Sequence, residues 1–288
     1  MSYYHSFMDQ FPTVKDLACA SEDAVLKTWE GLGYYSRARN LHKAAKWVYY
    51  ENGGEFPNNY AGLLKLPGIG PYTASAIASI CYNEPVAAVD GNVIRVLSRI
   101  FDLDFSAYDA KGKRAFDSYA SRMLAHHPPG NHNQAMMEFG AVICTPFPKC
   151  DQCPIVDSCE SYRLNNQSER PIKKKKVVIS QKQMHYALRT KGDKIAIEQR
   201  PTNGIWGGLF QLPLMEEAPK YQSAKKLAGP ITHKLSHVHM EVFLWDEREE
   251  ITQEKERQWA TVEELKKLGF PIVLKRLIDD KVLPLMLD

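Results

Sequence analysis

The first half of the chain carries apolar side chains at the spacing of one helix face. They are Leu41, Ala44, Ala45 and Val48 in "NLHKAAKWVYYENGG", and Val93, Val96, Leu97 and Ile100 in "GNVIRVLSRIF". The spacing i, i+3, i+4, i+7 is typical of the buried face of a helix. The first stretch ends at Asn52-Gly53-Gly54, which is a helix stop signal. Residues 1–160 are therefore predicted to form an all-α domain.

The helical pattern stops near residue 160. Residues 161–184 are polar and contain Pro171 and the run Lys173–Lys176, a composition typical of a linker. The lysine run fits a solvated tether, and it also fits a strap that follows DNA phosphates. Both interpretations stay open, because the two roles are compatible.

Residues 185–288 show strand-like patterns instead. "YALRTKGDKIAIEQRP" alternates around Gly192-Asp193, which predicts a β-hairpin. "GIWGGLFQLP" and "MEVFLWDE" predict further strands, and "TVEELKKLGF" predicts a helix with Thr261 as its N-cap. The second domain is therefore expected to be mixed α and β.

Composition limits the class of protein. A chain of 288 residues is long enough for two domains with separate cores. The apolar fraction of 44% and charged fraction of 25% are ordinary globular values, and no stretch resembles a membrane-spanning helix or a signal peptide. We therefore expect a soluble, cytoplasmic protein that binds no membrane. The net charge of +3 permits nucleic-acid binding without requiring it.

Four of the six cysteines lie in one short stretch, "CTPFPKCDQCPIVDSC". They are Cys144, Cys150, Cys153 and Cys159, with the spacing C-x5-C-x2-C-x5-C. Four thiols so close together in a reducing compartment predict a metal centre. Zinc and iron-sulfur both accept four thiolates, so the spacing leaves the two open. The remaining cysteines, Cys19 and Cys81, are expected to be buried apolar residues.

The stretch "LPGIGPYTA", residues 66–74, places two glycines directly before an apolar helix. Such glycines let a ligand approach the backbone at the positive end of a helix dipole, which suits a phosphate. A tight turn between two helices is the alternative. Downstream, "AVDGNVIRVLSR" carries Asp90 at a helix start, where an ordinary N-cap is the alternative to a functional carboxylate.

Together these stretches resemble a known superfamily. The glycine turn, the following helix and Asp90 resemble the helix-hairpin-helix and catalytic aspartate of the endonuclease III superfamily of DNA glycosylases. The cysteine stretch resembles the 4Fe-4S loop of that superfamily. "WEGLGYYSRARNLHKAA" and "NHNQAMMEFGAVICTP" resemble the MutY-type adenine DNA glycosylases, which remove adenine mispaired with 8-oxoguanine.

The resemblance extends into the second half of the chain. "GIWGGLFQLP" and "THKLSHVHMEVF" resemble the Nudix-like C-terminal domain of the same family, which checks the base opposite adenine. The G-x5-E-x7-R-E-x2-E-E-x-G box of a Nudix hydrolase does not follow "GGLFQLP", so pyrophosphate hydrolysis is disfavoured. The expected architecture is a helical glycosylase domain with a four-cysteine cluster loop over residues 1–160, a linker over 161–184 and a Nudix-like α/β/α domain over 185–288.

The resemblance assigns roles to particular residues. Asp90 would stabilise the sugar cation, assisted by Asn92. Tyr72 stands where bifunctional relatives carry a lysine nucleophile, and tyrosine forms no Schiff base, so a monofunctional glycosylase is implied. The residues implied to contact DNA are Leu32 and Tyr34 as a wedge, Gly68, Ile69 and Gly70 at a phosphate, Gln134 at the adenine edge and Ser236 at 8-oxoguanine. For Tyr72 a core aromatic is the alternative, and for Gln134 a surface amide.

The implied cofactor is a 4Fe-4S cluster, with zinc as the alternative. The implied partner is double-stranded DNA carrying adenine opposite 8-oxoguanine or guanine, bound by a monomer. The cysteine spacing departs from the family by one residue, because "TPFPK" is one residue shorter than the usual first interval. Cluster occupancy is therefore an expectation that needs its own test.

A second departure concerns the general acid. The family carries a glutamate in an early "SEVMLQQT"-like stretch, and no such stretch occurs in this sequence. Glu30 and Glu138 are not obvious substitutes, because the family carries glutamates at comparable positions beside its separate acid. We hypothesise that the chain is truncated at its start. Two functions follow: an adenine DNA glycosylase whose activity is compromised, or a non-catalytic binder of 8-oxoguanine mispairs.

Overall fold

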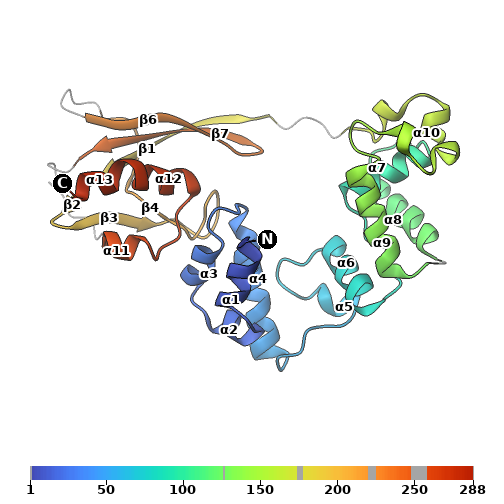
Figure 1. The fold of residues 1–288 in the computed structure, drawn as a ribbon, viewed down its shortest axis with the longest axis horizontal. Helices are drawn as coiled ribbons and strands as arrows, with labels where there is room; N and C mark the ends of the chain where they lie inside the picture. Colours follow the sequence, from blue (N-terminus) through green and yellow to red (C-terminus); the bar gives the residue numbers. More distant parts are fainter. Residues whose placement is uncertain (1, 126, 174–177, 220–224, 248–257, 288) are drawn as a thin grey trace. The chain divides into compact units, whose positions relative to one another are not determined.

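The structure is a computed structural model that describes every residue except 1, 126, 174–177, 220–224, 248–257 and 288. Its internal contacts divide the chain into two compact units (Figure 1). Unit 1 combines Met1–Gly54 with Val177–Asp288, and unit 2 is Glu55–Lys176. Most of the run Lys173–Lys176 lies outside the described residues, so its role as tether or strap stays a prediction.

Unit 1 begins with a small group of helices. They are α1 (Ser2–Gln10), α2 (Val14–Cys19), α3 (Glu22–Thr28) and α4 (Tyr35–Lys46), the last continued by the π-helical turn η1 (Trp47–Glu51). Thr13 starts α2 with a capping box that includes Asp16, and Ser21 caps α3 through the amide of Ala24. These caps satisfy amides that have no partner within their own helix.

The buried face of α4 differs in part from the predicted stripe. Ala44, Ala45 and Val48 are buried as predicted, but Leu41 is 40% exposed, so that prediction was wrong. The neighbouring residue His42 is buried instead, with its Nε2 atom 3.1 Å from the carbonyl oxygen of Ala20. Helix packing therefore turns His42 toward the core, because this polar contact compensates the burial of its ring.

The rest of unit 1 contains two sheets and a few short helices. The first sheet has the order β5 (Leu214–Met215), β1 (Ser180–Leu188), β7 (Val238–Asp246), β6 (Lys225–Lys234), with β1 and β7 parallel. The second joins β2 (Thr190–Lys191), β3 (Lys194–Gln199) and β4 (Phe210–Gln211), and β8 (Gln258–Thr261) also pairs with β3. The helices are α11 (Val262–Leu265), α12 (Ile272–Leu277), the π-helical turn η5 (Ile278–Val282) and α13 (Leu283–Leu287).

Several local predictions for this region are confirmed. Lys191 pairs with Lys194 across a two-residue turn in which Gly192 adopts a positive φ of 60°, so the predicted hairpin forms. Strand β7 contains the predicted "MEVFLWDE" up to Asp246, and Thr261 caps α11 in a capping box with Glu264. Within "GIWGGLFQLP" the regular strand is short, and it consists of Phe210–Gln211.

One hydrophobic core joins the N-terminal helices to the sheets of unit 1. Leu26 of α3 belongs to the same buried cluster as Leu209 and Leu274. Polar contacts accompany it: Phe270 donates its amide to the Glu30 carboxylate at 2.9 Å, and Gln199 donates to Asp23 at 2.9 Å. The division between residues 176 and 177 falls within the predicted linker, whereas the division between residues 54 and 55 falls inside the predicted helical domain, because the N-terminal helices share this core with the sheets.

Unit 2 is helical. Its α-helices are α5 (Tyr60–Leu63), α6 (Pro71–Tyr82), α7 (Gly91–Ile100), α8 (Ala110–Leu124), α9 (Pro129–Val142) and α10 (Glu160–Arg163), and its 3-10 turns are η2 (Cys150–Gln152), η3 (Val156–Ser158) and η4 (Gln167–Glu169). Val93 and Leu97 of α7 are buried with Phe116 of α8, which confirms the predicted inner face of α7. Helices α7 and α9 approach closely at Gly140, where an added Cβ would lie 2.8 Å from the Cβ of Asn92.

Two further expectations can be compared with the structure. Cys19 and Cys81 are exposed, so the prediction that they are buried apolar residues was wrong. Each lies at the solvent-facing end of a helix, where the helix face and not the residue type sets exposure. Among the described residues, no helix is long and apolar enough to cross a membrane.

Candidate functional site

The glycine turn between α5 and α6 has the backbone geometry that its sequence predicts. Gly68 adopts a positive φ of 79°, and Gly70 is the N-cap residue of α6 with Pro71 at the first helical position. A Cβ added to Gly70 would meet no atom within 4 Å, so open space lies in front of this helix end. The amide of Ile69 donates to the carbonyl oxygen of Leu66 at 3.1 Å. The predicted hydrogen bond from the Ile69 amide to a phosphate would therefore compete with this bond inside the turn.

Asp90 lies at the N-terminus of α7, and both of its carboxylate oxygens accept hydrogen bonds. Oδ1 accepts from the amide of Val93 at 2.8 Å, which makes Asp90 the helix cap. Oδ2 accepts from the side-chain amide of Asn92 at 3.1 Å. Asp90 is therefore an N-cap, which was the alternative interpretation of this residue. The cap fixes its carboxylate in one orientation at the positive end of a helix dipole.

Tyr72 lies in the first turn of α6, close to Asp90. Burial raises the pKa of the Tyr72 phenol, and the nearby negative charge of Asp90 raises it further. The hydroxyl donates to the sulfur of Met137 on α9 at 3.2 Å. On the same helix, the Gln134 side chain donates to Glu138 at 2.6 Å. Helices α6, α7 and α9 therefore bring Tyr72, Asp90 and Asn92 together, with Gln134 on the helix that Tyr72 contacts.

The site extends from Asn92 through Arg95. The Arg95 guanidinium donates to Asn92 Oδ1 at 2.8 Å, to the carbonyl of Gly140 at 2.7 Å and to the carbonyl of Cys144 at 2.8 Å. A continuous series of side chains thus runs from Asp90 through Asn92 and Arg95 to the first cysteine of the loop. Planar guanidinium groups suit this role, because several donors have a fixed relative geometry.

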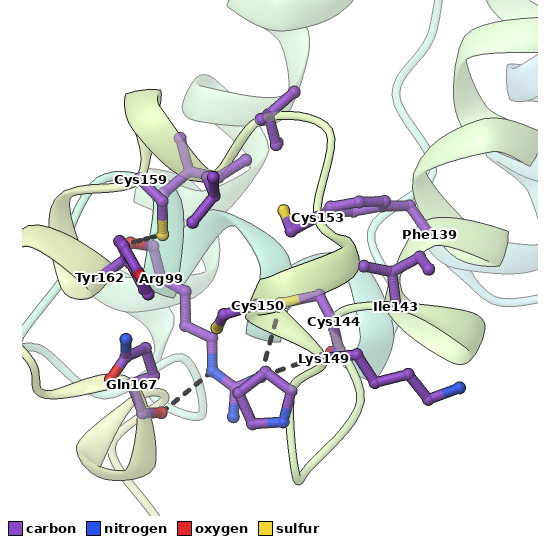
Figure 2. A pocket seen from close by; sticks show the side chains of 14 residues that line it. Arg99, Phe139, Ile143, Cys144, Lys149, Cys150, Cys153, Cys159, Tyr162 and Gln167 are labelled. Carbon is purple, nitrogen blue, oxygen red and sulfur yellow. Dashed lines mark hydrogen bonds between the residues drawn. The ribbon is translucent and has the colours of Figure 1, made fainter.

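The four clustered cysteines line a single cavity of unit 2 (Figure 2). The other lining side chains are mainly apolar and include Phe139, Ile143 and Ile155. Burial raises the pKa of the Cys150 thiol, and the neighbouring thiols raise it further. Burial likewise raises the pKa of the Cys159 thiol. The cavity thus disfavours the charged forms of the Cys150 and Cys159 thiols.

Arg99 holds the cysteine loop from the side of α7. Its side chain is 3% exposed, and its guanidinium donates to the carbonyls of Thr145 at 2.6 Å, Pro146 at 3.0 Å and Gln167 at 3.0 Å. It also approaches Cys144 Sγ at 3.4 Å, while Cys159 Sγ lies 3.4 Å from the Arg99 carbonyl oxygen. A buried cation whose donors are met by loop carbonyls fixes the loop that carries the thiols.

Unit 1 contains a separate pocket that combines three of the predicted DNA contacts. Leu32, Tyr34 and Ser236 line it, together with Trp206 and His237. The hydroxyl oxygen of Ser236 lies 3.3 Å from His237 Nδ1. Arg39 of α4 donates to the carbonyl oxygen of Gly207, which joins the two walls of the pocket. Residues about 200 positions apart in sequence thus meet around one cavity.

Tyr34 is held in an unusual position at the edge of this pocket. It precedes α4 in the left-handed region with φ 48° and ψ 49°, and its side chain is 72% exposed. The Arg37 guanidinium lies 5.2 Å from the Tyr34 ring centroid and 5.9 Å from that of Trp29. A non-glycine residue in this region costs about 1–3 kcal/mol and is concentrated at functional sites. The ring is therefore presented to solvent by a strained but supported backbone.

The sequence reasoning missed Arg95 and Arg99. Both lie on α7 after Asp90, one helical turn apart, and they interrupt an apolar helix. Charged residues beside a buried helix face require partners, so two arginines at this spacing on an apolar helix indicate that each binds polar groups inside the protein. The partners themselves, which are loop carbonyls about 45 to 68 residues away, are visible only in the folded chain.

Comparisons with known proteins identify the family of the chain. Residues 1–117 match the family model described as HhH-GPD superfamily base excision DNA repair protein, and residues 184–280 match a NUDIX domain. The adenine DNA glycosylase of Buchnera aphidicola subsp. Baizongia pistaciae is 35% identical over 248 residues, which cover 82% of this chain and 70% of that protein. That of Buchnera aphidicola subsp. Schizaphis graminum is 34% identical over 212 residues, which cover 73% of this chain and 61% of that protein.

Among solved structures, a thermostable thymine-DNA glycosylase aligns with a TM-score of 0.50 and 28% identity, covering 57% of this chain and 76% of that one. The helix-hairpin-helix unit and the Nudix-type sheets thus define a base excision DNA repair protein. More narrowly, the chain belongs to the adenine DNA glycosylase family. The predicted family and fold class are confirmed. The chain spans 61% of the length of the Schizaphis graminum relative and 40% of that from Arabidopsis thaliana.

Proposed function

We propose that the protein binds double-stranded DNA as a monomer and hydrolyses the N-glycosidic bond of adenine mispaired with 8-oxoguanine or guanine. The observation that carries the proposal is the Asp90 carboxylate, oriented by Val93 and Asn92 beside Tyr72. Cleaving this bond produces an oxocarbenium-like sugar, which a fixed carboxylate stabilises. Because Asp90 is already oriented, little reorganisation is needed when the positive charge develops.

The chemistry we infer is hydrolysis without strand cleavage. Tyr72 stands at the start of α6, beside the carboxylate, and a phenol cannot form a Schiff base with the sugar. A water molecule therefore attacks C1′, and the products are free adenine and an intact strand with an abasic site. DNA phosphates would be held at the open N-terminus of α6, in front of Gly70.

We further propose that unit 1 reads the base opposite adenine. The pocket lined by Leu32, Tyr34 and Ser236 supports this, because it combines an exposed aromatic ring with a hydroxyl group. A ring that enters the base stack eases extrusion of the partner base. A hydroxyl group that donates or accepts a hydrogen bond at the oxidised edge of the base would let the protein bind 8-oxoguanine in preference to guanine.

We propose that Cys144, Cys150, Cys153 and Cys159 hold a 4Fe-4S cluster. The chemistry of the donor set supports this proposal, because four thiols line one mainly apolar cavity whose loop is fixed by Arg99, but within the described part of the chain no three of them are placed to hold one metal ion. Four thiolates also suit zinc, which is the alternative occupant. When bound, the cluster would cross-link the loop between α9 and α10. Absorbance near about 400 nm with iron in the protein supports it, whereas stoichiometric zinc without iron contradicts it.

A second candidate, a non-catalytic binder of 8-oxoguanine mispairs, is favoured by the positions of two glutamates. Glu30 accepts from the amide of Phe270 and from Lys27, so it supports the core of unit 1. Glu138 accepts from Gln134. Both glutamates already accept hydrogen bonds within the protein, and we assign neither of them as the acid that protonates adenine. Such an acid typically contributes about 10²- to 10⁴-fold in rate.

The two candidates are separated with a duplex that carries adenine opposite 8-oxoguanine. Adenine excision predicts strand breaks at that position after alkali, and none before alkali, with an adenine–thymine duplex as the control. Binding of the mispaired duplex without any alkali-labile site supports the second candidate. Ser236→Ala should reduce the preference for 8-oxoguanine over guanine, and an unchanged preference contradicts the role of Ser236.

A further inference from the structure

One buried side chain of unit 2, Asn133, takes no part in the site described above but joins three of its elements. It lies on α9, is 2% exposed and makes three side-chain hydrogen bonds. Its Oδ1 accepts from the amide of Ala88 at 3.0 Å. Its Nδ2 donates to the carbonyl of Val86 at 2.9 Å and to the hydroxyl of Ser79 at 2.8 Å.

The bonds to Val86 and Ala88 have a specific structural meaning. Residues 83–90 connect α6 to α7 and belong to neither helix nor strand, so no neighbouring strand satisfies their backbone groups. The Asn133 amide presents one acceptor and one donor to residues two apart, as one peptide group of a paired strand would. It thereby fixes the backbone two residues before Asp90.

The third bond connects the same amide to α6. Ser79 lies on α6, which begins with the turn that carries Tyr72. Helices α6 and α9 also approach closely at Gly130, where an added Cβ would lie 3.0 Å from the Cα of Ile80. Asn133 therefore holds the segment that ends in Asp90 against α9, the helix that carries Gln134 and the Met137 sulfur to which Tyr72 donates, while the bond to Ser79 is an additional contact of the same amide.

We propose that Asn133 is a positioning residue that sets the location of the Asp90 carboxylate relative to Tyr72 and Gln134. The inference rests on the proposed function, and it concerns geometry that exists without DNA. The side-chain bonds of Asn133 go to neither Asp90 nor Tyr72; it acts through the backbone of residues 86–88. Misplacement of a catalytic group by about 1 Å can cost about 100-fold in rate.

The test compares Asn133→Ala with Ser79→Ala in the full chain. Ser79 is equally buried and belongs to the same network, but its removal leaves the bonds to Val86 and Ala88 intact. Single-turnover adenine release should fall about 10- to 100-fold in Asn133→Ala at unchanged affinity for mispaired DNA, and stay within about threefold in Ser79→Ala. Equal losses in the two variants would overturn the proposal.

A second readout does not depend on activity. The Tyr72 phenol senses the Asp90 charge, so its pKa, followed by NMR of ring-labelled tyrosine and assigned with Tyr72→Phe, reports their separation. Asp90→Asn gives the value without the charge. Asn133→Ala should move the pKa of Tyr72 toward that value, and Ser79→Ala should not. If Asn133→Ala does not fold, Asn133→Gln, which displaces the amide by one methylene, is measured with the same expectation.

The outcomes separate this inference from the proposed function. Wild-type protein that releases no adenine, with the expected shift of Tyr72, contradicts the function and supports the positioning role. Adenine release by wild type, with Asn133→Ala indistinguishable from Ser79→Ala in both readouts, supports the function and contradicts the positioning role.

Discussion

The guanidinium of Arg95 donates a hydrogen bond of 2.8 Å to the side-chain oxygen of Asn92. The same group donates to the carbonyl of Cys144, while Asn92 donates to the carboxylate of Asp90. The proposed reacting carboxylate and the cysteine loop are therefore joined by two side chains. A change in the loop can reach Asp90 through these bonds, because they fix the orientation of Asn92.

Replacing Arg95 by methionine should affect both ends of this series. The substitution removes the Arg95 donors from Asn92 Oδ1 and the carbonyl of Gly140, and it leaves the carbonyl of Cys144 only the 3.4 Å bond from Arg99. We expect the free energy of unfolding to fall by about 3 kcal/mol, together with the iron content and the rate of adenine release. Arg122→Met is the control, because Arg122 on α8 contacts the Tyr119 ring instead. Iron content and rate both at the wild-type level in Arg95→Met would contradict the link.

Gly140→Ala tests the close packing of α7 against α9. An added Cβ would lie 2.8 Å from the Cβ and 3.1 Å from the carbonyl oxygen of Asn92, so the helices must separate. We expect the free energy of unfolding to fall by about 1–3 kcal/mol in a denaturant titration. At Gly91, on the same helix as Asn92, a Cβ meets nothing within 4 Å. Gly91→Ala should change stability by less than about 0.5 kcal/mol, and equal effects of the two substitutions would argue against this packing.

Gly70→Ala separates DNA binding from folding. The position is open and its φ of −93° suits any residue, so the substitution introduces no strain and should lower the melting temperature only slightly, because alanine is a poorer N-cap than glycine. The added methyl group occupies the space in which a phosphate would approach α6. We expect affinity for duplex DNA to fall about tenfold, the equivalent of one hydrogen bond to a charged group. Unchanged affinity in a fluorescence-anisotropy titration would exclude a phosphate at this helix end.

Stability should decrease in mildly acidic solution, in part because of His185. This ring is stacked on Phe243 at 4.7 Å, and its Nδ1 accepts a hydrogen bond of 3.2 Å from the indole of Trp245. Burial lowers the pKa of His185, so the unfolded chain takes up a proton more readily than the folded one. The stabilisation is therefore present above pH of about 6.5, the unfolded value, and is lost as the pH falls through the folded value.

The measurement is the melting temperature as a function of pH between roughly pH 8 and pH 5, the range in which histidine titrates. His185→Phe should show a smaller decrease than wild type, whereas His5→Phe, at an exposed position of α1, should follow wild type. An identical decrease in wild type and His185→Phe would show that His185 does not contribute. Burial also lowers the pKa of His42 and His233, so part of the decrease should persist.

Local features of the fold were predictable because their causes lie within a few residues. The Gly192-Asp193 hairpin and the Thr261 cap each depend on adjacent side chains and backbone preference. Asp90 was predictable for the same reason, since a carboxylate at a helix start satisfies amides of its own helix. For Asp90 the functional interpretation came from resemblance, and the local structure came from chemistry.

Other features depend on contacts that the sequence pattern does not reveal. Leu41 fits a helical stripe, yet packing of α4 buries His42 beside it. Asp23 and Gln199 are 176 residues apart and bond to each other, so the compact unit that contains the N-terminal helices also contains the C-terminal sheets. The anchoring of the cysteine loop by Arg99 likewise requires knowing where distant carbonyls lie.

The most direct test of the account is single-turnover release of adenine from a duplex with adenine opposite 8-oxoguanine, comparing wild type with Asp90→Asn. Asparagine caps helices as well as aspartate does, so the substitution removes the charge and keeps the fold within about 0.5 kcal/mol. We expect adenine release by wild type and its loss in folded Asp90→Asn that still binds the duplex. Release at equal rates by the two proteins would contradict the assignment of Asp90, and no release by wild type would leave a mispair-binding protein.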